Sequence, residues 1–303
     1  MKKLKLVISF SGGRSSAVMS KICMDKYKDT HEILVIFANT GCEHPATLNF
    51  VRDCDINWGL GVVWVEGVYS PIKGEGISHK VVDYNSAARN GEPFEEYIKC
   101  YGIPNQANPS CSQKLKKHPI NSYLSSIGWR RGGYGPPDYK MAIGIRADEI
   151  DRISKSAMKD GVVYPLIDMG INKQAVNNAM SNIPWDLKIP NDAYGNCVWC
   201  WKKSNRKLMT LAKDFPSAFD FPLLMENRYS SHMTYYPDGT EYKCLGPDKK
   251  RHFFRGHRDV KDIFQSASRM QESDKYGEEV IQPGLFDPVL DLGGGCESSC
   301  EAF

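Results

Sequence analysis

The chain has 303 residues, of which 41% are hydrophobic, and it carries a formal net charge of +3. This length suits one large domain or two modest ones, with enough apolar residues for a sizeable core. No apolar run approaches the roughly 20 residues that a membrane-spanning helix needs, and the apolar part of the basic N-terminal segment is too short for a secretion signal. We therefore expect a cytoplasmic protein without membrane contacts.

Cysteine usage points away from a disulfide scaffold, because ten cysteines are sparse for a chain of this length. Two pairs are closely spaced, Cys197-Val-Trp-Cys200 and Cys296-Glu-Ser-Ser-Cys300. In a reducing compartment such spacing indicates metal binding or redox chemistry.

The first predicted element is a buried strand that ends near Phe10. Ser11-Gly12-Gly13 follows as a tight turn, and apolar residues from Ala17 to Ile22 then recur at helical spacing. Glycines let the backbone approach a ligand closely, and the first amides of a helix lack partners of their own. The stretch therefore predicts an anion-binding seat, with an ordinary strand-to-helix turn as the alternative.

Further apolar runs at 33–38, 61–65 and 140–145 predict three more strands, with a helical stretch such as Pro45–Cys54 between two of them. This alternation predicts an α/β fold with a mostly parallel sheet and helices on both faces. Ligands of such sheets bind at the carboxyl ends of the strands. The glycine turn, Asn39-Thr40-Gly41 and Arg146 all follow strand ends, so we expect them to converge.

The remaining segments are less regular. Residues 66–110 suggest an insertion or lid, and residues 129–139 a loop. After about residue 190 the chain becomes aromatic, basic and cysteine-containing, which predicts an α/β domain over 1–195 and a smaller C-terminal region over 196–303. The glycines before Cys296 predict a mobile arm.

Four ordered stretches carry a resemblance to a known family. They are Ser9-Phe10-Ser11-Gly12-Gly13-Arg14-Ser15-Ser16, then Asn39-Thr40-Gly41-Cys42-Glu43-His44-Pro45, and Gly144-Ile145-Arg146-Ala147-Asp148-Glu149 with Arg152, followed by Tyr164–Asp168. Together they resemble the PP-loop superfamily, and within it the phosphoadenosine phosphosulfate (PAPS) reductase-like group of adenine nucleotide alpha hydrolases. The resemblance covers roughly residues 4–205.

The resemblance implies that the glycine loop grips the pyrophosphate of ATP, or the matching groups of a sulfonucleotide such as adenylylsulfate (APS) or PAPS. Amides, hydroxyls and a helix dipole suit such oxyanions, and arginines add bidentate charge. The residues implied in nucleotide binding are Ser9, Ser11, Gly12, Gly13, Arg14, Ser15, Ser16, Asn39, Thr40, Gly41, Glu43, Arg146 and Arg152. A surface salt bridge is the alternative role for each of the last two arginines.

One departure from the family pattern favours a sulfonucleotide. ATP-cleaving members carry Ser-Gly-Gly-x-Asp-Ser, and Ser15 occupies the place of that aspartate. A carboxylate beside phosphates usually accompanies a magnesium ion. Glu43 is the alternative carboxylate for such an ion.

The stretch from Asn108 to Pro119 resembles the Cys-Cys segment of iron–sulfur APS reductases, which hold a [4Fe-4S] cluster through that segment and a later Cys-x-x-Cys pair. Cys111, Cys197 and Cys200 match, whereas Ser112 stands in place of the second cysteine. A cubane takes one soft ligand for each iron. The fourth position is assigned to Cys244, with a cysteine of the C-terminal arm or an open site as alternatives. Zinc is the alternative metal, and a site without metal is the third interpretation.

The terminal pair Cys296 and Cys300 is the candidate catalytic thiol pair, because sulfonucleotide reductases carry a nucleophilic cysteine on a C-terminal arm. The Glu-Cys-Gly-x-His motif of those enzymes is absent, and Glu297 and Glu301 would raise the pKa of the neighbouring thiols. Cluster ligation and an incidental pair are the alternatives.

Basic and aromatic residues interleave from Lys249 to Arg258. Such a pattern suits phosphate contact and base stacking on a nucleic acid. The alternative is a surface segment that packs Phe253 and Phe254 inward.

Two enzymatic hypotheses follow, with a non-catalytic nucleotide-binding module as the third. The first is a sulfonucleotide reductase that receives electrons from a thiol donor such as thioredoxin. The second is an ATP-dependent sulfurtransferase that thiolates tRNA or DNA. The first draws on the Cys111 segment and the missing loop aspartate, the second on the three-cysteine count and the basic-aromatic segment.

Overall fold

The computed structural model describes residues 3–72, 74–129, 137–231, 234–235, 241–242 and 250–277. The roles predicted for Cys244, Cys296 and Cys300 therefore concern residues outside the described ones, as does most of the loop expected at 129–139. Within these ranges, no helix combines the length and the apolar character needed to cross a bilayer.

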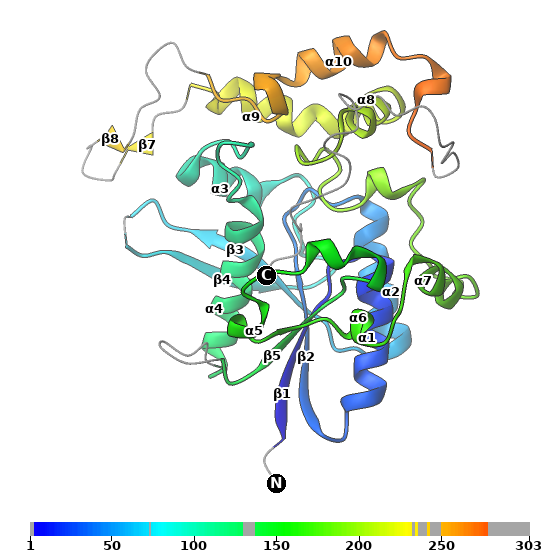
Figure 1. The fold of residues 1–303 in the computed structure, drawn as a ribbon. Helices are drawn as coiled ribbons and strands as arrows, with labels where there is room; N and C mark the ends of the chain where they lie inside the picture. The colour runs from blue at the N-terminus through cyan, green and yellow to red at the C-terminus, as the bar shows by residue number, and fades with distance from the viewer. Residues whose placement is uncertain are drawn as a thin grey trace.

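A six-stranded sheet in the order β4-β3-β2-β1-β5-β6 forms the centre of the molecule (Figure 1). The pairs β1–β2, β2–β3, β1–β5 and β5–β6 are parallel, and β3–β4 is antiparallel. The α/β fold with a mostly parallel sheet is thus confirmed. The strands are β1 (Leu4–Ser9), β2 (His31–Ala38), β3 (Val63–Tyr69), β4 (Ile77–Val82), β5 (Lys140–Ile143) and β6 (Val162–Val163).

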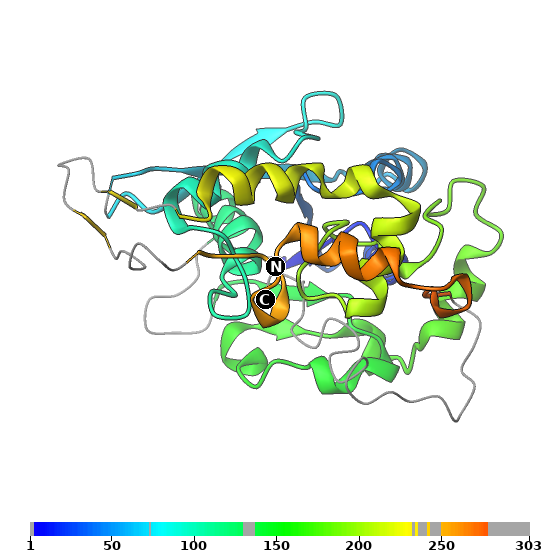
Figure 2. The ribbon, with the colours of Figure 1, turned by 90° about the horizontal axis from the view of Figure 1, so that it is seen from above.

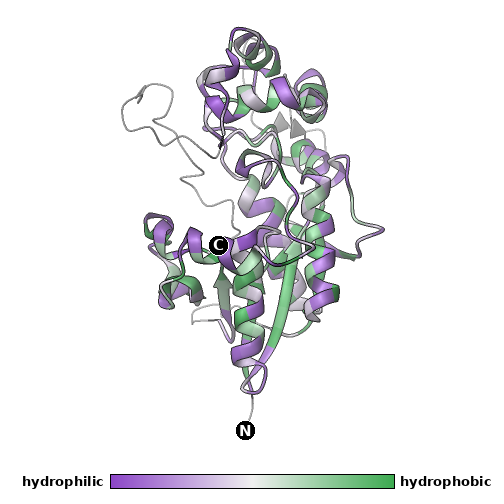
Figure 3. Ribbon diagram, turned by 90° about the vertical axis from the view of Figure 1, so that its right-hand side faces the viewer, coloured by the Kyte–Doolittle hydropathy of each residue, from purple (hydrophilic) through white to green (hydrophobic). Residues whose placement is uncertain are grey.

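Helices cover both faces of this sheet. On one face α1 (Arg14–Tyr27), α2 (Pro45–Trp58) and α7 (Lys173–Met180) bury their apolar residues against β1, β2 and β3. On the other face α4 (His118–Ser126) packs Ile120 and Leu124 against Val7, Ile36 and Met141. Figure 3 shows the apolar strands between helices whose outer sides are hydrophilic. Short helices α5 (Ala157–Asp160) and α6 (Pro165–Asp168) flank β6.

The stretch expected to be an insertion or lid, 66–110, is instead integrated into the fold. It contains the end of β3, the edge strand β4 and helix α3 (Glu92–Tyr101), and α3 buries Phe94 and Tyr97 in a third core. The sequence did not predict β4 because polar residues interrupt its apolar ones. Such residues are usual in a strand at the edge of a sheet, where one side of the strand has no neighbouring strand.

The third core lies beyond the carboxyl ends of the parallel strands. There α3 meets α8 (Asn205–Asp214), α9 (Asp220–Tyr229) and α10 (Val260–Ser268) around Trp199. Figure 2 shows α9 and α10 side by side above the sheet. This core joins residues from both sides of the boundary predicted at 195, and that boundary stays a prediction. A short hairpin, β7 (Thr234–Tyr235) with β8 (Glu241–Tyr242), completes the described elements.

Candidate functional site

The register of the sheet aligns the ends of β1 and β5. Ser9, the last residue of β1, pairs with Ile36 of β2 and with Ile143 of β5. The loops after β1 and β5 therefore begin next to each other at the carboxyl edge of the sheet, which is where such folds bind ligands.

The turn after β1 requires glycine at position 12. Gly12 has φ +81°, and a Cβ atom there would lie 2.5 Å from Thr47 Cγ2 of α2. Gly13 has ordinary extended angles and open space around it, since the nearest atom to an added Cβ would be Ser11 Oγ at 3.9 Å. Gly12 thus lets the chain pass closely over α2 before α1 begins.

Ser16 fastens this turn from within the first turn of α1. Its hydroxyl donates to the Gly13 carbonyl oxygen at 2.9 Å and lies 3.2 Å from the Ser11 amide and 3.0 Å from Ser11 Oγ, both of which donate to it. The Ser16 hydroxyl therefore serves to shape the loop.

The N-terminus of α1 has the electrostatic character of an anion seat. Gly13 is the N-cap residue, no side chain from the described residues caps the helix, and its first turn contains no acidic residue. The first amides of a helix lack carbonyl partners, and the helix dipole places partial positive charge there.

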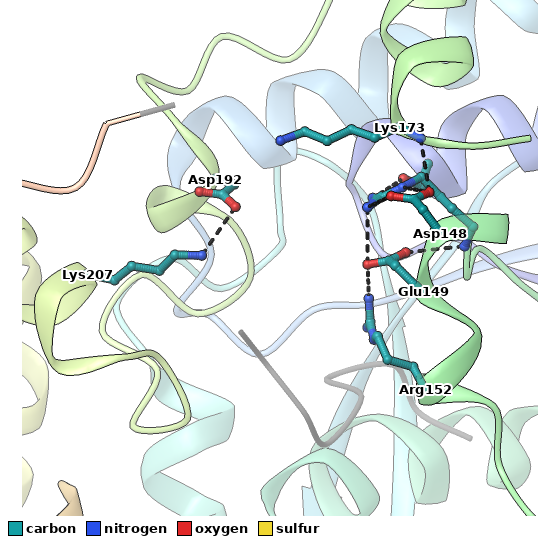
Figure 4. A network of polar contacts seen from close by, with 8 residues as sticks. Asp148, Glu149, Arg152, Lys173, Asp192 and Lys207 are labelled. Carbon is teal, nitrogen blue, oxygen red and sulfur yellow. Dashed lines mark hydrogen bonds and ion pairs between the residues drawn. The ribbon is translucent and has the colours of Figure 1, made fainter. Parts of the chain in front are cut away.

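Arg146 approaches this seat from the end of β5. Its guanidinium donates to Ser15 Oγ at 3.2 Å and forms an ion pair with Asp148 at 3.0 Å, which holds the pKa of Asp148 below its usual value. The approach depends on Gly144, because a Cβ there would lie 2.9 Å from Ser16 Cα. Glu149 in turn pairs with Arg152 (Figure 4).

A cleft of about 430 Å³ opens over the seat. Figure 4 shows residues from its two sides: Glu149, Arg152 and Lys173 on one, and Asp192 paired with Lys207 at 3.2 Å on the other. Among the described residues, six basic side chains line the cleft against two acidic ones, Glu149 and Asp192. The basic residues are Arg14, Arg146, Arg152, Lys173, Lys203 and Lys207. Such a lining favours an anionic ligand with more than one charged group.

Eight of the predicted nucleotide-binding residues line the cleft: Ser11, Gly12, Gly13, Arg14, Ser15, Ser16, Arg146 and Arg152. Arg14 also forms an ion pair with Asp186, at 2.8 Å, in the segment that follows α7. Ser9, Asn39, Thr40, Gly41 and Glu43 are described by the structure but are not among the lining residues.

The segment after β2 instead turns towards the thiols. Asn39 donates to the fully buried Glu66 at 2.6 Å. The Thr40 hydroxyl donates to Glu43 at 2.8 Å and lies 3.5 Å from Cys197 Sγ. Glu43 also pairs with Cys197 as an isolated antiparallel bridge. Glu43 therefore lies beside a cysteine and is not among the residues that line the cleft.

Of the thiols predicted to bind metal, the structure describes Cys111, Cys197 and Cys200, and Cys111 lies near Cys197. Cys111 and Cys200 are buried, and burial together with Glu43 raises the pKa of Cys197 to about 12 against the opposing effect of Lys116. Cys111 is close enough to contribute to that rise. In the part of the chain that the structure describes, no three His, Cys, Asp or Glu side chains surround a point suited to a single metal ion.

The basic-aromatic segment is organised by packing. Phe253 and Phe254 are buried in the third core, where Phe253 contacts Trp199 edge to face with ring centroids 4.9 Å apart. Their rings are therefore unavailable for stacking on nucleic-acid bases, and the second interpretation of this segment is the one observed.

Several lining residues escaped the sequence analysis. Thr47, Lys173, Asn177, Asn191 and Asp192 reach the cleft from α2, α7 and the chain before Cys197. Lys203 and Lys207 fall in the stretch after residue 190 that the sequence marks only as aromatic, basic and cysteine-containing. Gly144 is a lining residue that the sequence could have indicated, because a glycine directly after an apolar strand often permits close backbone contact.

A family model described as the phosphoadenosine phosphosulfate reductase domain matches residues 5–150, which contain the seat, Arg146 and Cys111. This part of the chain belongs to the PAPS reductase-like PP-loop family. The matched residues do not include the Cys-x-x-Cys pair or the lysines on the far side of the cleft.

One relative matches almost the whole chain, and others match parts of it. An uncharacterized nin region protein, ORF290, of Escherichia phage lambda is 28% identical over 98% of this chain and 94% of its own length. An uncharacterized protein of Methanocaldococcus jannaschii is 33% identical over 33% of this chain and 24% of its own. A PAPS reductase from Candida auris, solved as a phosphate complex, aligns with 58% of this chain and 71% of its own at 17% identity and a TM-score of 0.34.

Proposed function

We propose that the protein binds an adenine sulfonucleotide, APS or PAPS, in the cleft and reduces its sulfo group to sulfite. The observation that carries the proposal is the uncapped start of α1 inside a cleft lined mainly by basic side chains. Amides at the helix start would hold the anhydride oxygens, and Arg146, fixed on Ser15, would contact the same group.

The reduction needs a thiolate, and the terminal pair Cys296 and Cys300 is the candidate. One thiolate attacks the sulfur of the sulfo group, so an S–S bond forms while the S–O bond breaks and the nucleotide phosphate leaves with the bonding electrons. The second thiol then attacks the sulfur of the first cysteine, which forms a disulfide and releases sulfite. A thiol donor such as thioredoxin restores both thiols. Positive charge from Arg146 would stabilise the leaving phosphate.

Cys111, Cys197 and Cys200 would hold a [4Fe-4S] cluster next to the cleft, with a fourth ligand from the remaining cysteines. Soft thiolates are the donors that such a cluster takes, and each thiolate binds a separate iron, so the sulfurs are spread more widely than around one zinc ion. When bound, the cluster would supply redox capacity beside the cleft. The support in the structure is the proximity of Cys111 to Cys197, with both thiols largely shielded from solvent.

An assay with three nucleotides tests the reaction. The anaerobically purified chain is incubated with PAPS, APS or ATP in the presence of a thiol donor. We expect sulfite from PAPS or APS, loss of sulfite release in Cys296→Ser and Cys300→Ser, and normal release in the control Cys100→Ser. AMP and pyrophosphate from ATP only when tRNA or DNA is present would instead establish the sulfurtransferase alternative and overturn the reductase.

A further inference from the structure

Lys203 places its ammonium group inside the loop that carries the cysteine pair. The residue is only 6% exposed, yet its side chain belongs to the most strongly hydrated type. Lys203 Nζ donates to the carbonyl oxygens of Gly195 at 3.0 Å, Cys197 at 2.8 Å and Val198 at 2.6 Å. An ammonium group has three N–H donors, and these three carbonyls match them in number.

The loop around Lys203 gathers backbone carbonyl oxygens around one positive charge. Three backbone carbonyl oxygens converge on one point, which concentrates negative potential there, and Asn196 adopts a left-handed conformation with φ +56°. The Cys200 amide donates to the Cys197 carbonyl at 3.0 Å, and the Lys203 amide donates to the Cys200 carbonyl at 3.0 Å. Residues 195–203 therefore form a loop whose carbonyl groups bind the side chain of its last residue, Lys203.

This arrangement fixes Cys197 from two sides. Lys203 holds the carbonyl of Cys197, while Thr40 lies 3.5 Å from its sulfur. Immediately after Lys203 the chain enters α8, whose N-cap Ser204 accepts from the Lys207 amide, so the backbone of the lysine is anchored by a helix. Rigid support of this kind is what holds a ligating side chain in a single geometry.

We propose that Lys203 is the positioning residue of the Cys197–Cys200 pair, an internal cation around which the loop folds so that both thiols are held in place for their ligand. The inference deepens the proposed function, because it rests on these thiols serving the site beside the cleft. The positioning itself is measurable without metal or nucleotide.

The test is site-resolved alkylation of the full chain with iodoacetamide, read by mass spectrometry of cysteine peptides. In Lys203→Met we expect Cys197 and Cys200 to react about tenfold faster or more, since charge-assisted hydrogen bonds are lost and tenfold corresponds to about 1.4 kcal/mol. Cys54, fully buried in α2, should keep its rate. The matched control is Lys213→Met, which removes a lysine that donates to the Met270 carbonyl at 2.7 Å away from the loop.

Unchanged rates at Cys197 and Cys200 in folded Lys203→Met would overturn the proposal. An equal rise at Cys54 would do the same, because it would indicate a general loss of stability. If Lys203→Met does not fold, Lys203→Gln retains some donors and should give a smaller rise confined to the same two cysteines. A second readout is the absorption spectrum after reconstitution with iron and sulfide: a wild-type chain without a cluster would defeat the cluster hypothesis, while the alkylation result would still decide the role of Lys203.

Discussion

Arg146 donates a hydrogen bond to the Ser15 hydroxyl at 3.2 Å, across 131 residues of sequence. The contact joins the start of α1, the helix after β1, to the chain that follows the adjacent parallel strand β5. It places a guanidinium group at the uncapped start of α1, so a single anion at that place would meet helix amides and a cation together.

Gly12→Ala should weaken nucleotide binding by about tenfold or more, because the new Cβ would displace the turn that aims the helix amides. The cause is contact with Thr47 Cγ2 at 2.5 Å combined with φ +81°. Gly277→Ala is the control, since a Cβ there has no atom within 4 Å among the described residues and Gly277 does not line the cleft. Fluorescence titration with a labelled adenine nucleotide measures both. Equal affinities of the two variants would contradict the geometry of the seat.

Arg146→Gln should lower the affinity for sulfonucleotides by about tenfold or more, because a charge-assisted contact is lost. Affinity for adenosine, which has no phosphate, should not change. The control is Arg52→Gln, which removes an arginine of α2 paired with Asp53. A uniform loss of affinity for adenosine and sulfonucleotides would assign Arg146 to folding and remove it from the binding site.

Anaerobic purification should yield protein that contains iron and acid-labile sulfide, and Cys200→Ser should lose most of both because one soft ligand is removed. Cys23→Ser, in the buried face of α1, is the control that should retain them. Colorimetric iron and sulfide analysis of the two variants checks the result. Bound zinc in place of iron would favour the alternative metal.

Glu226 should make folding stability depend on pH. Burial raises its pKa to about 7, against the lowering effect of hydrogen bonds from the Phe253 and Val260 amides. Its carboxyl group, with an ordinary pKa of 4.5 when unfolded, therefore binds a proton more tightly in the folded chain. Stability from this group is fully present below pH 4.5 and falls as pH rises towards 7, by about 3 kcal/mol.

Glu226→Gln should remove that slope, although the amide can accept only one of the two backbone hydrogen bonds and lowers stability at every pH. Denaturant unfolding of wild-type and variant chains at a series of pH values gives the difference. Glu96→Gln, whose side chain is 53% exposed, is the control. A wild-type-minus-variant difference that stays constant from pH 4.5 to 7 would show that Glu226 does not titrate in this range.

The sequence predicted the elements whose residues are buried on both sides. Continuous apolar runs marked β1, β2, β3 and β5, because central parallel strands have no polar face. Strand β4 has only half-buried and exposed positions at the sheet edge, and β6 has only two residues, so neither formed a recognisable run.

For the site, the glycine turn was predictable because φ and close approach restrict position 12 to glycine. The positions of Asn39 and Glu43 outside the cleft were not predictable from the sequence, because they depend on partners far along the chain. Asn39 binds Glu66, a carboxylate buried inside β3, and Glu43 binds Thr40 beside Cys197. No local pattern marks an acidic residue in the middle of a strand as such a partner.

The most direct test of the account is calorimetric titration of the wild-type chain with PAPS, APS, ATP and adenosine. We expect at least one of the three charged nucleotides to bind at one site per chain, with inorganic sulfate or phosphate competing and adenosine binding far more weakly. If all three fail to bind, or if adenosine binds as tightly as they do, the basic cleft over the start of α1 is not a nucleotide anion site.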